Sequence, residues 1–175
     1  MKRYIILTLF TVILSASVFG QRLAYVDSEY ILRHIPEYSS AHKQLDALSE
    51  QWQKEIETKF AEAVKMSKDY QADKVLLTDD MRKKRELDIF QKEKEANELQ
   101  QLRFGFEGDL FKQKVRLIKP IQEKVSKAIE EYAGRENIDL VLDKSSVTLL
   151  YARANFDSTN DVITRMGFKP GSFAK

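Results

Sequence analysis

The sequence of 175 residues contains no cysteine and only two histidines. Without cysteine, the chain has no disulfide, no thiol nucleophile and no sulfur ligand for a soft metal ion. His34 and His42 would lie roughly 12 Å apart on one helix, which is too far for both to bind one metal. We therefore interpret both histidines as solvent-facing side chains.

A phosphate-binding loop is also absent. The glycine pairs within Gly105–Gly108 and Gly167–Gly171 lack the lysine and the serine or threonine of such a loop. Asp27, Asp139 and Asp143 lie near predicted strands and could converge, but helix caps and turns explain them more simply. No set of nucleophile and base is visible. The sequence therefore predicts neither an enzyme nor a cofactor, and any activity would run without ATP.

Only the N-terminus carries a long apolar run. Met1–Arg3 is basic, Tyr4–Leu14 is apolar but too short to span a bilayer, and Val18 and Gly20 suit a signal-peptidase site. We predict that residues 1–20 form a secretory signal peptide, with an uncleaved membrane anchor as the alternative. No cysteine stands near the cut, which excludes a lipoprotein.

An excess of charge of one sign is missing as well. The net charge is +2, and Lys2 and Arg3 of the predicted signal peptide account for it. The rest of the chain is neutral. Overall charge therefore favours neither nucleic acid nor a membrane surface as a partner.

Most of the remaining chain is predicted to be helical. Apolar residues recur about every 3.67 residues from residue 41, which is typical of a nearly straight helix. This stripe consists of Ala41, Leu45, Leu48, Trp52, Ile56, Phe60 and Ala63, and it weakens beyond Ala63. A second stripe runs from Leu87 to Tyr132. Thr78–Asp80 is short and polar and suits the reversal between the two helices, with Thr78 or Asp79 as the cap.

The returning helix has three weak points. Gly105 and Gly108 each cost about 1 kcal/mol relative to alanine in a helix interior, and Pro120 removes a helical hydrogen bond. We interpret Gly105 and Gly108 as a flexible zone of the arm, and Pro120 as a bend where the arm joins the body. Alternatively, Pro120 separates two helices.

A short strand and a brief helix are predicted before the long helical stretch. Arg22–Val26 is short and apolar, as suits a buried strand. Asp27 or Ser28 can then cap a helix over Glu29–His34. Pro36 is tolerated in the first turn of the helix that follows.

Two further strands are predicted after it. Gly134 suits the end of the returning helix. Ile138–Leu142 and Val147–Tyr151 have strand character and are separated by the turn-forming residues 143–146. We therefore expect them to form a β-hairpin.

The C-terminal region is predicted to hold one more helix. Ser158–Asp161 resembles a capping box in which aspartate replaces the usual glutamate. The helix would run through Met166. Gly167–Lys175 is interpreted as a frayed tail.

These elements predict one elongated domain of the α+β class that is mainly α. A long antiparallel helical hairpin, a coiled-coil arm over residues 37–119 with its tip near 78–81, would project from a small β body. Residues 21–36 and 120–167 would form the body, and 168–175 the tail.

Three short strands leave sheet edges exposed, and pairing between identical chains in a three-fold ring would cover them. The residues expected at this oligomerisation surface are Leu23, Tyr25, Val26, Ile138, Leu140, Leu142, Leu149 and Tyr151.

Charge is distributed unevenly along the arm. Ala41–Asp80 has 6 basic and 9 acidic residues, whereas Met81–Pro120 has 11 and 7, so the two helices should attract each other. A positive patch lies at the predicted tip and consists of Arg82, Lys83, Lys84 and Arg85. It suits contact with anionic lipid or with acidic client segments. Plain solubility is the alternative explanation.

The body segments resemble a known family. The chain is similar to the Skp (OmpH-like) family of periplasmic chaperones over residues 23–27, 30–32, 117–129, 138–143, 150–151 and 157–163. The resemblance follows the order of elements over the whole chain after the signal peptide, while the arm is similar only in type. Two departures stand out. The chain is neutral where enteric members are strongly basic, and Ser158 replaces a usually apolar residue.

The resemblance implies a homotrimer whose strands form a common β-barrel, with three helical hairpins around a cavity. Family members hold unfolded outer-membrane proteins in the periplasm without ATP and prevent their aggregation. We therefore expect an ATP-independent holdase chaperone whose partners are unfolded outer-membrane proteins and its own copies, and not nucleic acid. An exported coiled-coil structural or adaptor protein of the cell envelope is the alternative.

Overall fold

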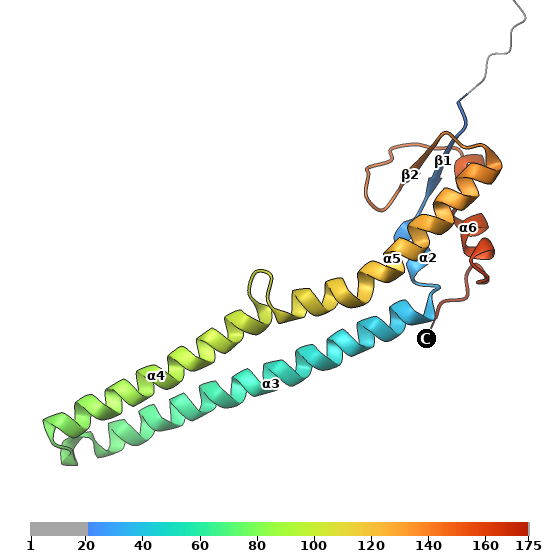
Figure 1. Cartoon of the computed structure of the whole chain (residues 1–175). Helices are drawn as coiled ribbons and strands as arrows, with labels where there is room; N and C mark the ends of the chain where they lie inside the picture. Colours follow the sequence, from blue (N-terminus) through green and yellow to red (C-terminus); the bar gives the residue numbers. More distant parts are fainter. Residues whose placement is uncertain (1–20, 175) are drawn as a thin grey trace, which may run out of the picture.

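The computed structural model describes residues 21–174, so the predicted signal peptide lies outside the described residues. Figure 1 shows a long arm that projects from a small body. The elements in chain order are β1 (Leu23–Val26), α2 (Ser28–Leu32), α3 (Pro36–Asp73), the 3-10 helix η1 (Lys74–Leu76), α4 (Asp79–Phe104), α5 (Asp109–Glu136), β2 (Leu140–Asp143), the 3-10 helix η2 (Ala154–Phe156) and α6 (Thr159–Arg165). The predicted α+β, mainly helical fold with a long helical hairpin is confirmed.

The outgoing helix α3 follows the predicted pattern. Pro36 occupies its first turn, where a missing backbone N–H costs no helical hydrogen bond. The predicted stripe faces the returning helices, with Leu48 and Phe60 half-buried. Its buried members are Ala41, Leu45, Trp52, Ile56 and Ala63. The period of 3.6 residues thus correctly identifies the packed side of α3.

The reversal at the far end of the arm also lies where the sequence predicts it. Thr78 is the N-cap of α4, and its hydroxyl accepts a hydrogen bond from the Met81 N–H at 3.4 Å. Asp79 and Asp80 occupy the first turn, where negative charge is favourable to the helix dipole. η1 closes the gap between α3 and this cap.

The returning helix is broken between α4 and α5. The break coincides with Gly105 and Gly108, and both glycines are sterically required. A Cβ at Gly105 would collide with the Gln101 carbonyl oxygen, and one at Gly108 would lie 2.9 Å from the Leu102 oxygen. Glu107 takes a left-handed conformation with φ of 52°. The break is therefore a tightly built loop, whereas its flexibility stays a prediction.

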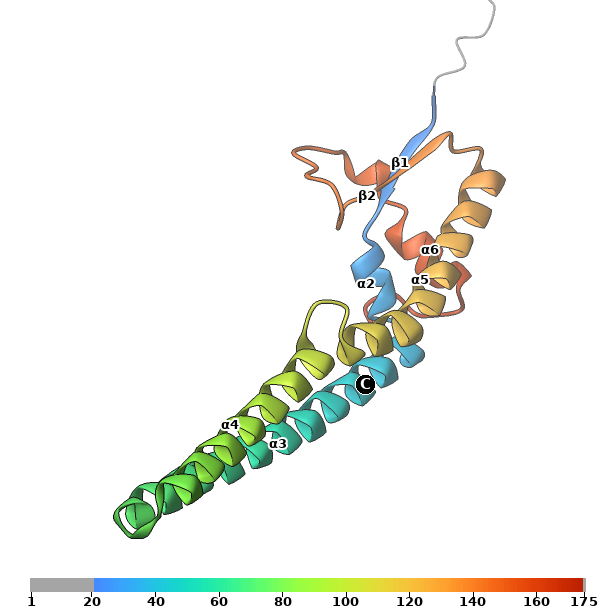
Figure 2. The ribbon, with the colours of Figure 1, turned by 60° about the vertical axis from the view of Figure 1, so that its left-hand side comes forward.

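Helix α5 continues past both residues predicted to limit it. Pro120 lies inside α5, so the alternative that it separates two helices is wrong. Figure 2 shows α5 changing direction along its length, as the loss of a helical hydrogen bond at proline favours. The helix also passes Gly134. It ends at Glu136, and its C-cap Asn137 has a left-handed φ of 50°, which lets the next N–H, that of Ile138, also donate to the Ala133 oxygen at 2.9 Å.

The sheet differs from the prediction. β1 and β2 pair in parallel, with Leu23 opposite Leu140 and Val26 opposite Asp143. The predicted hairpin is wrong, because residues 147–151 form no strand. The turn itself forms, with the Ser146 N–H donating to the Asp143 oxygen at 3.0 Å. β1 occupies one edge of β2, and within residues 21–174 no strand pairs with the other edge.

The core lies where α2, the near part of α3, α5 and α6 meet β1. It comprises Val26, Ile31, Leu32, Ile35, Ala41, Leu45, Ile118, Ile121, Val125, Val162 and Ile163. Residues that precede the arm and residues that follow it both contribute, so the core of the body is complete only when the two are together. The arm is thereby anchored to the body at both of its helices.

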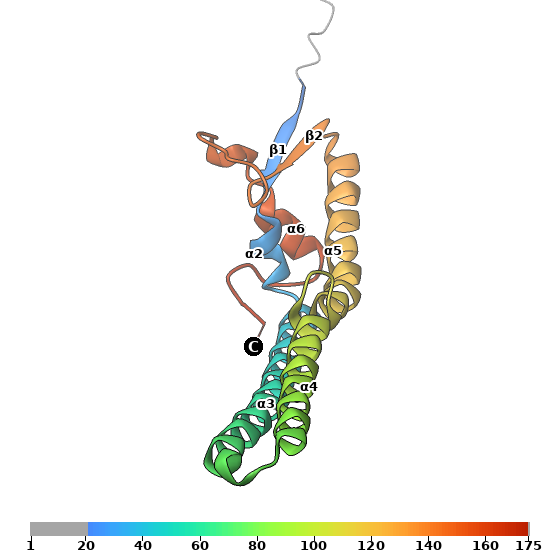
Figure 3. The same cartoon turned by 90° about the vertical axis from the view of Figure 1, so that its left-hand side faces the viewer.

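Helix α6 and the segment after it depart from two predictions. The Ser158 side chain makes no capping bond, so the predicted capping box is absent. Instead, Asp157 Oδ1 accepts a hydrogen bond from the Thr159 N–H at 2.9 Å. The C-terminal segment is not frayed, because the Ala174 N–H donates to the Arg33 oxygen at 3.1 Å. Figure 3 shows this segment returning beside α2.

Candidate functional site

The two-stranded sheet presents an apolar face that is largely exposed. Side chains alternate along a strand, and the parallel register sets Leu23 beside Leu140 and Tyr25 beside Leu142. Leu140 is 50% exposed and Leu23 46%. Four residues predicted for oligomerisation therefore share one face.

An apolar hollow of about 270 Å³ adjoins this face. The sheet contributes one wall, and the other is formed by Leu149 and Tyr151 of the extended segment after β2 and by Phe156 of η2. Leu150 is 93% exposed and Tyr151 81%. Exposed apolar side chains that gather beside a hollow are typical of a surface that binds a partner.

The structure brings together six of the eight residues predicted for oligomerisation. Val26 is different, because it points to the opposite side of β1 and lies in the core of its own chain. Ile138 is half-buried next to α5. We therefore define the apolar sheet face as Leu23, Tyr25, Leu140, Leu142, Leu149 and Tyr151. The role of this face in oligomerisation stays a prediction.

Two further exposed apolar residues of this region, Leu150 and Phe156, are absent from the predicted set, and of these Phe156 lines the hollow. Leu150 lies within the predicted strand Val147–Tyr151 but is not among the residues predicted for oligomerisation, and Phe156 belongs to no predicted element. The signal available for Leu150 was the run of apolar residues in Val147–Tyr151. Phe156 had no comparable signal, since it lies alone among polar residues.

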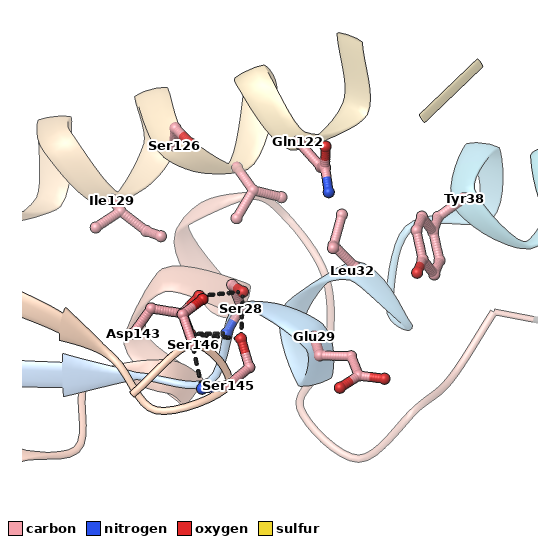
Figure 4. Close-up of a pocket in the computed structure, with 11 residues that line it drawn as sticks. Ser28, Glu29, Leu32, Tyr38, Gln122, Ser126, Ile129, Asp143, Ser145 and Ser146 are labelled. Atoms are coloured by element: carbon pink, nitrogen blue, oxygen red, sulfur yellow. Dashed lines mark hydrogen bonds between the residues drawn. The ribbon is translucent and has the colours of Figure 1, made fainter. Parts of the chain in front are cut away.

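A polar pocket of about 590 Å³ lies on another side of the body, between α2, α5 and the turn after β2. Figure 4 shows Asp143 at its wall, surrounded by hydroxyl groups. Asp143 accepts hydrogen bonds from the Ser28 hydroxyl at 2.7 Å and the Ser145 N–H at 3.0 Å. Burial alone would raise the pKa of Asp143, but the bonds from Ser28 and Ser145 outweigh it and lower the pKa to about 2. The carboxylate therefore stays charged and fastens α2 to this turn.

The other two aspartates near the strands also act structurally. Asp27 is the N-cap of α2 and accepts from the Tyr30 N–H at 2.8 Å. Asp139 accepts from the Arg22 N–H at 2.8 Å. The interpretation is therefore confirmed for Asp27 as a cap and for Asp143 as a turn residue, whereas Asp139 instead binds the backbone where the sheet begins.

The histidines do not form a site together. His34 is 2% exposed, so its interpretation as a solvent-facing residue is wrong. It lies at the end of α2, whereas His42 lies on α3 and packs edge-on against Tyr38. Within the described part of the chain, no group of three or more His, Asp or Glu side chains lies close enough to hold a metal ion.

A polar junction fastens the arm at its break. The Arg103 guanidinium donates to Asp109 Oδ2 at 2.6 Å and lies 3.7 Å from a carboxylate oxygen of Glu55. Its planar group also lies 4.7 Å from the centre of the Trp52 ring. Arg103 thereby ties α4 to both α3 and α5. Within the two ranges whose attraction was predicted, Arg103 and Glu55 form an ion pair between α4 and α3. Lys124 and Glu37, just outside these ranges, pair between α5 and α3.

The basic patch lies in the first turns of α4, at the far end of the arm (Figure 1). Arg82 is partly engaged, because it donates to the Lys74 oxygen at 3.0 Å and pairs with Asp79. Lys83, Lys84 and Arg85 are exposed. Apolar side chains are exposed nearby, among them Val75, Leu76, Leu87 and Phe90. The tip therefore offers both charge and apolar surface.

Comparison with known proteins identifies the family. Residues 22–166 match the family model described as Outer membrane protein (OmpH-like). No curated protein matches the chain. The chain is similar to the crystal structure of a Caulobacter crescentus CB15 protein named as an OmpH-like outer membrane chaperone, with a TM-score of 0.67 and 14% identity, over 91% of this chain and 92% of that one. At this identity the likeness shows the fold alone.

The described residues contain no helix with the length and apolar composition needed to cross a bilayer. The family model covers most of the sequence, including β1, the arm, β2 and α6. The resemblance inferred from the sequence is confirmed: the chain belongs to the OmpH-like outer membrane protein family.

Proposed function

We propose that the protein is an ATP-independent holdase chaperone of the periplasm. Three copies would join through the apolar sheet face, and unfolded outer-membrane proteins would be held between the arms. Family membership and the fold shared with a named outer membrane chaperone support a chaperone role. The observation that carries the proposal is the combination of an exposed apolar sheet face with a long, sparsely packed arm.

Assembly is favoured by what a single chain leaves in contact with water. β2 has an edge that no strand of the described residues occupies, and the extended segment after it exposes Leu150 and Tyr151. A second copy supplies complementary strand edges and covers these side chains. Each 100 Å² of apolar surface removed from water contributes about 2.5 kcal/mol. A cyclic arrangement lets every copy satisfy both of its edges.

The arm suits weak and exchangeable binding. α3 has 38 residues, which corresponds to a length of roughly 57 Å. A cavity bounded by arms of this length has room for a collapsed, unfolded domain. The arm surface mixes exposed apolar side chains with charges of both signs, so many contacts share the binding energy. We therefore expect no single arm residue to be essential.

The test is suppression of aggregation. A urea-unfolded β-barrel membrane protein is diluted into buffer, and light scattering is followed with and without the purified chaperone. We expect near-complete suppression at about one trimer per client. If the assembled protein does not reduce scattering at a several-fold excess, the holdase proposal is wrong.

A pair of variants links holding to assembly. Leu140→Arg places a charge on the apolar sheet face and should lower the mass measured by sedimentation and abolish suppression. Leu87→Arg changes a comparably exposed leucine on α4 and should leave both unchanged. A monomeric Leu140→Arg protein that still suppresses aggregation would show that the cage is unnecessary.

The alternative is an exported coiled-coil adaptor that binds one folded partner. The observation that favours it is Phe106, which is 98% exposed on the tight loop that breaks the returning helix. A single, fully exposed aromatic side chain suits a specific contact better than a diffuse one. Stoichiometric capture of one folded envelope protein, lost in Phe106→Ala and accompanied by no affinity for unfolded chains, would favour this function.

A further inference from the structure

The C-terminal segment, residues 167–174, is docked at the root of the arm. Gly167 and Gly171 have positive φ angles of 85° and 79°, which turn the chain back toward α2. The Ala174 N–H then donates to the Arg33 oxygen at 3.1 Å. Arg33 ends α2, and Pro36 begins α3 three residues later. The segment therefore braces the joint between body and arm.

The contact depends on the state of one buried imidazole. His34 Nδ1 lies 2.8 Å from the Tyr30 carbonyl oxygen, and a carbonyl can only accept, so Nδ1 carries a proton. His34 Nε2 lies 3.0 Å from the Gly171 nitrogen, whose N–H donates. Nε2 must therefore keep its lone pair. Both bonds form together only when the ring is neutral with its proton on Nδ1.

The His34 ring is flanked by the aromatic rings of Tyr30 and Phe173. The Phe173 ring centre lies 4.8 Å from that of His34, and the Arg33 guanidinium lies 5.5 Å from the Phe173 ring. No ion pair of residues 21–174 includes His34. The elements around the ring bring the titratable or charged groups Glu29, Tyr30, Arg33, Glu37, Tyr38 and Lys169. Of these, the Arg33 guanidinium lies 5.6 Å from the centre of the Tyr30 ring and 5.5 Å from that of Phe173, the two rings that flank the imidazole.

We propose that residues 167–174 form a proton-sensitive clasp on the root of the arm. Neutral His34 holds the clasp closed through Gly171. A proton on Nε2 places a donor opposite the Gly171 N–H donor, which removes the bond and leaves a buried charge. Protons therefore favour the open clasp, and the joint between body and arm loosens as pH falls. The proposal does not depend on chaperone activity.

The size of the effect follows from linkage. An ordinary, exposed histidine loses its proton near pH 6.5. If the closed clasp excludes the proton, lowering the pH from 7.5 to 5.0 raises the ratio of open to closed clasp about thirtyfold. Such a shift is large enough to measure at single amides.

The experiment is amide hydrogen exchange on the full assembled protein at pH 7.5 and 5.0, corrected for the chemical exchange rate at each pH. We expect protection at Gly171 and Ala174 to fall about thirtyfold at pH 5.0. His34→Gln keeps an acceptor for Gly171 without a titrating ring, so its protection should not change. His42→Gln, at the only other histidine, is the matched control and should behave like the unmodified protein.

Either of two results overturns the proposal: equal protection at both pH values in the unmodified protein, or the same loss in His34→Gln. A second measurement needs no variant. Nitrogen-15 chemical shifts of the His34 ring at pH 7.5 should identify the Nδ1–H form. A proton on Nε2, or on both nitrogens, would contradict the clasp directly.

Discussion

The two halves of the arm are built differently, although α3 runs through both. Near the body, Leu45 of α3 joins Ile118 and Ile121 of α5 in the core of the body. Toward the tip, α3 packs on α4, and of the 26 residues of α4 only Ala96 is buried. One half is an extension of a hydrophobic core. The other is a pair of helices in which α3 buries Ile56, Ala63 and Tyr70, whereas α4 contributes a single buried alanine.

This difference has an energetic consequence. Alanine buries little apolar area, so the outer half gains less from packing than the half near the body. In the outer half, polar contacts such as the hydrogen bond from the Tyr70 hydroxyl to Glu86 add to this packing. The outer arm should therefore open at a lower free energy than the body. A tip that opens more easily than the root would suit the proposed chaperone, because clients differ in shape.

The largest expected effect comes from removing packing near the body. Ile121→Ala deletes a side chain that is 5% exposed and should lower the free energy of unfolding by about 3 kcal/mol. Ile56→Ala deletes an equally buried side chain of the outer half. It should cost about 1–2 kcal/mol, because the thin outer arm can close around the cavity more easily. Urea denaturation gives both values.

Hydrogen exchange sharpens this comparison. Ile56→Ala should raise exchange only within the outer part of α3 and α4, whereas Ile121→Ala should raise it throughout the body. Equal losses of stability with the same exchange pattern in both variants would show that the arm and the body unfold as one unit, and the comparison would fail.

The glycines of the helix break should be more sensitive than a helical glycine elsewhere. Gly108→Ala forces a Cβ to within 2.9 Å of two carbonyl oxygens and should cost about 2 kcal/mol. Gly134→Ala places a Cβ inside α5 where nothing lies within 4 Å, and it should stabilise by about 1 kcal/mol. Thermal unfolding of the two variants measures opposite shifts. A stabilised Gly108→Ala protein would argue against a tightly built loop.

Arg103 should couple the halves of the arm. Arg103→Lys keeps the charge but loses the planar group that contacts Asp109 and Trp52, and should cost about 1.5 kcal/mol. Arg116→Lys, on the exposed surface of α5, is the matched control and should be neutral. In a double-mutant cycle, the effects of Arg103→Lys and Asp109→Asn on the free energy of unfolding should be coupled. If the two effects simply add, Arg103 does not link the halves of the arm.

The smallest expected effect concerns pH. The pKa of Asp143 is about 2 in the folded chain and about 3.9 in an unfolded one. Its contribution to stability is therefore complete above about pH 4 and is lost as pH falls toward 2. After allowance for its partial exposure, Asp143→Asn should cost about 1 kcal/mol at pH 7. The denaturation curves of Asp143→Asn and of the unmodified protein should differ at pH 7. At pH 2 the two curves should coincide. A constant difference would contradict the charge-based explanation.

Local patterns predicted much of the arm. The stripe from Ala41 to Ala63 and the cap at Thr78 depend on helical periodicity and on one hydroxyl, and both were correct. The loss of apolar pattern beyond Ala63 was also informative, with Tyr70 as the exception, since it is buried and bonded to Glu86. Its hydroxyl finds a partner on α4 that no local pattern could reveal.

The sequence by itself determined that this chain has a long helical arm, where the arm turns, and which family it resembles. The tertiary structure decided the pairing of β2 with β1, the burial of His34 and the docking of the C-terminal segment. The physical reason is the distance along the sequence over which each interaction acts. Periodicity and caps act over a few residues, whereas the Gly171–His34 bond joins residues 137 positions apart. Which distant groups meet depends on how the whole body packs, and no single segment encodes that.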